Sequence, residues 1–115
     1  MKDDKYLEIE SLLYSYKKLP YEIKGLEIKT KLDSSNEEAK SELEKKKLVL
    51  ELINNMLEFL EDEDKIGYKV ILYRYIEGES WAIVAGKLAQ EDIFYCGRVL
   101  HRKAAAAIKI LQQFV

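Results

Sequence analysis

Residues 93–114 read IFYCGRVLHRKAAAAIKILQQF, and they set the expectation for the whole fold. The four alanines favour helix, so we expect one long helix from about Ile93 to Phe114. At 100° per residue, its apolar side chains share one side: Cys96, Val99, Leu100, Ala107, Ile110, Leu111 and Phe114. The opposite side carries Phe94, Arg98, His101, Arg102, Ala105, Lys109 and Gln112. One face should therefore pack on a core while the other presents basic side chains to solvent.

The residues before this stretch predict two shorter helices. Residues 65–76 are apolar on nearly every face, which places their helix in the middle of a domain, and Gly78 ends it. Ser80 is the expected cap of a short helix in which Trp81, Val84, Ala85 and Leu88 share one face, and residues 89–92 form the next turn. A central helix, a short helix and a long helix, with a tight turn between the last two, are the parts of a helix-turn-helix.

A helix-turn-helix that binds DNA presents the outer face of its last helix to phosphates and base edges in the major groove. Arg98 and His101 are the expected base or near-base contacts, and Phe94 can touch a thymine methyl group. Arg102, Lys103 and Lys109 are the expected phosphate contacts. The alternative interpretation of the same charges is an ordinary solvated helix face.

The N-terminal half predicts a helical hairpin. Apolar spacing indicates a helix over 6–16, and Leu19-Pro20 separates it from a second segment over 21–32. Residues 33–36 interrupt the helical pattern. Ser34 with Glu37, or Ser35 with Glu38, fits a capping box at the start of a long helix. A heptad seam, with Lys46 as its polar member, follows: Leu43, Leu50, Ile53, Leu57 and Leu60. Its partner is either the first helix folded back or the same seam of a second subunit in a homodimer.

Charge divides the chain into the same two parts. Residues 1–64 hold 11 basic and 17 acidic side chains, a balance of −6, whereas residues 65–115 hold 8 and 4, a balance of +4. The acids over 61–64 suit the first turn of the next helix. We therefore expect an all-α chain with a hairpin over 1–61 for oligomerisation or partner contact, and a DNA-binding domain over 62–115.

Several functional classes are not expected. One Cys and one His allow neither an internal disulfide nor a zinc site of ordinary ligand number, and Cys96 should be a small buried apolar residue. The acidic pairs lie on solvated helix faces and no glycine-rich phosphate loop occurs, so neither an enzyme nor a cofactor is expected. No apolar run approaches the roughly eighteen residues of a membrane span, and the N-terminus lacks a signal-peptide pattern. A cytoplasmic protein without a membrane partner is expected.

Two stretches carry a family resemblance. Residues 73–88, YRYIEGESWAIVAGKL, and residues 95–104, YCGRVLHRKA, resemble the fourth region of bacterial sigma factors. The likeness covers about residues 62–112. With an acidic helical N-terminus added, the layout is most similar to small phage and prophage transcription activators of Gram-positive bacteria, of the late-gene and autolysin-regulator type. The resemblance implies sequence-specific binding of double-stranded DNA by the helix from Ile93, support from a helix over 81–88, and contact with RNA polymerase.

Two other functions fit the same pattern. A helical protein-interaction module would use the helix-turn-helix only as a scaffold, which the acidic N-terminal half, Ala89 in the turn and Gly97 in the last helix allow. A phage terminase small-subunit-like protein would also recognise DNA but should assemble into rings.

Overall fold

The computed structural model describes residues 2–115, and every regular element in that range is helical. The expectation of an all-α chain is therefore confirmed. The elements are α1 (Asp4–Ser15), α2 (Leu19–Leu32), α3 (Glu37–Glu63), α4 (Lys65–Ile71), the π-helical segment η1 (Leu72–Ile76), α5 (Trp81–Ala89), α6 (Gly97–Leu111) and the 3₁₀ turn η2 (Gln112–Phe114). Within the same range no helix is both long enough and apolar enough to cross a membrane.

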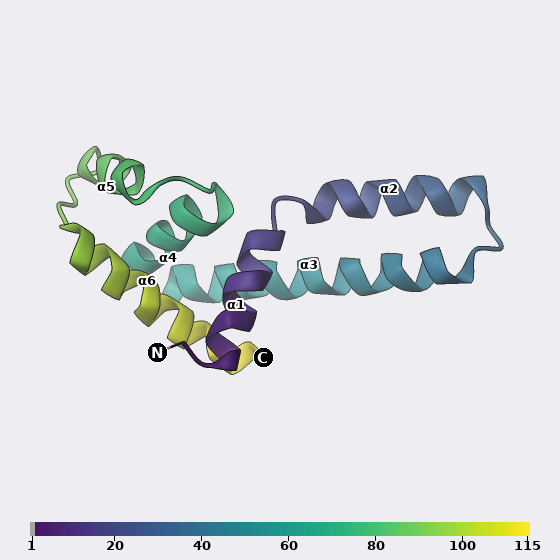
Figure 1. Cartoon of the computed structure of the whole chain (residues 1–115), viewed down its shortest axis with the longest axis horizontal. Helices are drawn as coiled ribbons and strands as arrows, with labels where there is room; N and C mark the ends of the chain where they lie inside the picture. The colour runs from purple at the N-terminus through teal and green to yellow at the C-terminus, as the bar shows by residue number, and fades with distance from the viewer. Residues whose placement is uncertain (1) are drawn as a thin grey trace.

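An elongated shape results from a hairpin that projects out of a packed body (Figure 1). The principal extents are 54, 28 and 25 Å. α2 and the first half of α3 lie side by side along the long axis. α4 and α6 pack on α3, and α1 and α5 pack on α6 and η1. The buried core comes from all of these helices: Ile9, Leu13, Leu19, Ile53, Met56, Leu57, Leu60, Val70, Ile71, Tyr75, Val84, Leu88, Leu100, Ala104, Ala107, Ile108 and Leu111.

Local capping explains where several helices begin. The Asp64 carboxylate accepts a hydrogen bond from the Gly67 amide at 2.9 Å, and it lies so close that a Cβ on Gly67 would clash with its other oxygen. The Ser80 hydroxyl caps α5 as expected, accepting from Ile83 N at 3.3 Å. The capping-box prediction for α3 is wrong, because the cap is Asn36, whose side chain accepts from Ala39 N.

The acids before α4 also differ from the prediction. Residues 61–63 form the last turn of α3, and only Asp64 lies at the start of α4. The long helix continues through them because its C-terminal segment packs in the core, with Leu60 fully buried.

α2 is the hairpin partner of α3, not the first helix of the chain. Leu19, Ile23 and Ala39 are buried between the two helices, and Lys46 pairs with Glu22 at 3.3 Å. The heptad seam is covered within the chain: Ile53, Leu57 and Leu60 are buried, and Leu43 and Leu50 are half-buried. Tertiary packing of this one chain therefore satisfies the seam.

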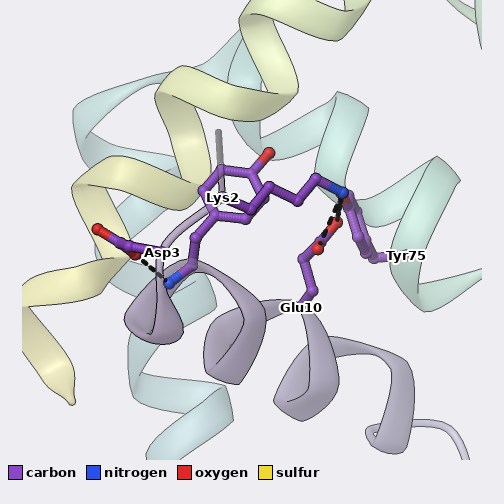
Figure 2. A network of polar contacts seen from close by, with 5 residues as sticks. Lys2, Asp3, Glu10 and Tyr75 are labelled. Atoms are coloured by element: carbon purple, nitrogen blue, oxygen red, sulfur yellow. Dashed lines mark hydrogen bonds and ion pairs between the residues drawn. The ribbon is translucent and has the colours of Figure 1, made fainter.

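α1 packs on α6, η1 and η2 instead of on the hairpin. A polar network, buried at Tyr75 and Glu10, fixes this contact (Figure 2). The Tyr75 hydroxyl donates to Glu10 Oε2 at 2.7 Å, and Lys2 Nζ lies 3.1 and 3.2 Å from the two carboxylate oxygens of Glu10. Burial first, and the bond to Glu10 second, raise the pKa of Tyr75. The first helix thus packs with the C-terminal helices, although the sequence grouped it with the hairpin.

Candidate nucleic-acid interface

The candidate interface is the solvent face of α6, which begins later than the sequence predicts. α6 starts at Gly97, so residues 93–96 belong to its connection with α5. Cys96 has extended backbone angles at the N-cap and is exposed, which corrects the prediction of a buried thiol on the apolar face. Leu100, Ala107 and Leu111 are buried as that face requires, together with Ala104 and Ile108.

The late start follows from the way α5 ends. Ile93 N donates to Leu88 O at 2.9 Å and Asp92 N donates to Ala89 O at 3.0 Å, which is the hydrogen-bond pattern of a Schellman motif. Asp92 takes the left-handed position of this motif, with φ of 63°. Ala89 is still helical, so the residue that stands where Gly is usual is Asp92. The seven-residue connection, 90–96, is longer than the expected tight turn.

A stack of side chains joins η1, α5 and α6. The Arg74 guanidinium carbon lies 4.7 Å from the Trp81 ring centroid, and the His101 ring centroid lies 4.1 Å from that of Trp81. Arg74 Nη1 also donates to the backbone carbonyl of Glu79 at 3.0 Å. The cation–π contact joins η1 to α5, and the Trp81–His101 ring contact joins α5 to α6. His101 is exposed, yet its ring is used in this stack.

Two ion-pair clusters tie α5 and its following turn to α4, to η1 and to the residues that follow η1. Glu91 accepts hydrogen bonds from Lys69 and from the Tyr73 hydroxyl, and these bonds, that from Lys69 first, lower the pKa of Glu91. Lys87 lies 2.9 Å from Glu77 and 3.8 Å from Glu79. The lysines of this part of the surface are therefore neutralised by nearby carboxylates.

The basic side chains of α6 have no such partners. Within residues 2–115, none of Arg98, Arg102, Lys103 and Lys109 forms an ion pair, and α6 contains no acidic residue. Arg98 and Arg102 are exposed and lie one helical turn apart. The first amides of α6 also lack a side-chain cap, so the positive end of the helix is open to solvent beside Arg98. This surface can accept anionic oxygens.

The structure separates the six predicted contact residues into groups. Arg98, His101 and Arg102 lie together on the first turns of α6. Phe94 is 74% exposed but lies in the connection, not on the helix face where the sequence placed it. Lys103 is half-buried, with Nζ 5.8 Å from the Tyr95 ring.

Lys109 lies apart from the others. It is eleven residues beyond Arg98, or about 16 Å along the helix axis. There it lines a shallow cavity with Asp3 and Tyr6 of the N-terminal segment.

Arg74 and Tyr95 have supporting roles that the sequence alone does not indicate. Arg74 reaches Trp81, and Tyr95 lies beneath Lys103, through contacts that residue spacing on one helix does not reveal. The sequence signal that points to this contact is Trp81, the one aromatic residue of α5, at its first position. No protein-family model, curated protein or solved structure matches this chain.

Proposed function

We propose that this chain is a DNA-binding transcription regulator in which α5 and α6 act as a helix-turn-helix. The observation that carries the proposal is the exposed row of Arg98, His101 and Arg102 on a helix without acidic residues, whose cations have no ion-pair partner within residues 2–115. A duplex supplies the missing counter-charge, since its phosphates accept from arginine and from free helix amides. α6 enters the major groove with its N-terminal turns.

The supporting contacts give this helix the rigidity that base recognition needs. Trp81 contacts His101 of α6 and is itself held by Arg74, and the Lys69–Glu91–Tyr73 cluster fixes the turn. The roles then divide by position. Arg98 reads a base edge with His101 beside it, and Arg102 contacts phosphate. Phe94, which is exposed in the connection between α5 and α6, can touch a thymine methyl group.

Transcription control, a phage or prophage source and contact with RNA polymerase enter the proposal only through the resemblance of residues 73–88 and 95–104 to the fourth region of sigma factors. In that scheme the hairpin of α2 and α3 is the part available for polymerase or for another subunit, because it projects from the body that holds α6 (Figure 1).

Fluorescence anisotropy with random-sequence duplex DNA at two salt concentrations tests the proposal. Affinity should fall steeply with salt, and the Arg98→Ala, Arg102→Ala variant should bind more weakly, with the salt slope reduced by about one to two units. If Arg98 makes a bidentate base contact, Arg98→Ala alone should cost about 1–3 kcal/mol. The matched control is Lys45→Ala, Lys47→Ala, which removes the same charge from exposed positions of α3.

The outcomes separate the candidate functions. Absence of salt-dependent binding by the wild-type chain would refute DNA recognition and favour the protein-interaction module. Equal loss of affinity in the α6 and α3 variants would refute α6 as the binding surface. A terminase-like protein would bind DNA as a ring, which light scattering on the DNA-bound sample detects.

A further inference from the structure

The outer side of the hairpin carries apolar residues that no part of the described chain covers. On α2, Tyr21 is 79% exposed, Ile28 is 51% exposed and Leu32 is 84% exposed. They follow at spacings of seven and four, so they form one stripe on the side of α2 opposite the buried Leu19 and Ile23. On α3, Leu48 is 57% exposed and lies half a turn round the helix from the buried Ala39. α2 therefore has an apolar stripe on its outer side, and α3 has one exposed leucine on its own outer side.

Charged residues flank these apolar positions in matching patterns. Lys24 and Lys31 flank Ile28, and Glu44 and Glu51 flank Leu48, both with spacings of four and then three residues. In each triplet, the two charged residues are consequently rotated about 40° and 60° around the helix axis from the apolar residue, both in the same direction. Within residues 2–115 none of these four charges forms an ion pair.

We propose that α2 of one copy packs antiparallel against α3 of a second copy through these two triplets. When two helices pair antiparallel, the same side of each meets the other, as in a two-fold rotation. Ile28 then lies opposite Leu48, Lys24 faces Glu51, and Lys31 faces Glu44, each within about one residue of level register. The triplets cannot meet within one chain, because α2 and α3 already face each other through their opposite sides.

A symmetric contact between two copies of α2 is disfavoured by the same charges. Pairing the two stripes would place Lys24 and Lys31 of each copy beside the same lysines of the other. The acidic side of α3 removes that repulsion, so charge selects α3 of the second copy as the partner. The contact is head-to-tail, and it extends the antiparallel order already present in the hairpin.

This contact uses surfaces different from α6 and does not rest on the DNA-binding proposal. A single pair of helices buries an area at or below about 1,200 Å², the low end for specific complexes, so the association should be weak and should depend on concentration. Each copy can make one contact through its α2 and a second through its α3. The assembly of the 13.5 kDa chain should therefore grow beyond a dimer.

Sedimentation velocity of the full chain over a wide concentration range tests the proposal. The wild type should exceed the mass of a dimer at high concentration, and Lys24→Glu, Lys31→Glu should weaken association by about tenfold. Glu44→Lys, Glu51→Lys should weaken it similarly, and the fourfold variant should restore it, because both ion pairs re-form with reversed polarity. The charge-matched control, Lys5→Glu, Lys65→Glu, should associate like the wild type.

Circular dichroism of each variant checks that the exposed substitutions leave the helices intact. A chain that stays monomeric at every concentration overturns the proposal, as does an assembly that stops at a dimer. If the double charge reversals leave association unchanged, or if the fourfold variant does not restore it, the contact lies elsewhere and the proposal is overturned. Ile28→Ser, Leu48→Ser supplies an independent readout, since removal of both apolar contacts should also weaken association.

Discussion

Replacing Tyr75 by Phe isolates the hydrogen bond that ties the first helix to the C-terminal helices. The substitution keeps the ring, which is 6% exposed and stacks on Tyr14 with centroids 4.9 Å apart. It removes only the hydroxyl that donates to Glu10 at 2.7 Å. The Glu10 side chain is 11% exposed, so its carboxylate loses a donor in a place that water reaches poorly.

The expected loss of stability follows from these contacts. A hydrogen bond to a charged group contributes about 1.5–3 kcal/mol. Lys2 continues to hold both oxygens of Glu10, but its own side chain is 55% exposed and brings solvent to the site. The loss should therefore lie at or slightly below the lower end of that range, at about 1–2 kcal/mol.

Urea unfolding followed by circular dichroism measures this difference. The matched control is Tyr14→Phe, which deletes the hydroxyl of a tyrosine that is 51% exposed and should change stability by less than about 0.5 kcal/mol. A Tyr75→Phe variant as stable as the wild type, or no less stable than Tyr14→Phe, would show that the buried carboxylate does not depend on this bond.

Two further predictions concern the turn between α5 and α6. Asp92→Gly should stabilise the chain by about 0.5–1 kcal/mol in urea unfolding, because glycine adopts the observed φ of 63° without steric cost; Gln90→Gly, at a helical position, should have the opposite sign. The pKa of Glu91 is lowered by Lys69 and Tyr73, so its contribution to stability is present above the ordinary value of 4.5 and is lost as pH falls through the lowered value. Glu91→Gln should accordingly be less stable than the wild type near neutral pH and equal to it in strong acid, where both side chains are uncharged. A difference between the two proteins that persists unchanged into acid would contradict the assigned role of the carboxylate.

The sequence by itself was sufficient wherever short-range chemistry decides the structure. Ser80 caps α5 because a hydroxyl at that position satisfies an amide three residues later, a contact inside one turn. Leu100, Ala107 and Leu111 are buried as their helical spacing predicts, and Arg98 and Arg102 are exposed on the other side. The all-helical class and the separation of basic from apolar residues on the last helix are consequences of such local periodicity.

Tertiary structure decided the features that depend on distant residues. Tyr75 meets Glu10 across 65 positions of the chain, so no local pattern could place α1 on the C-terminal helices. α2 follows the turn at Lys17 and Lys18 and packs on α3. A heptad pattern on one helix shows which face is buried, but it does not show which helix packs against that face. The apolar periodicity also could not predict that α6 starts at Gly97, because the Schellman turn at Asp92 redirects the backbone before Cys96. Spacing along a helix thus determines which side chains share a face, whereas only packing between helices determines what that face meets.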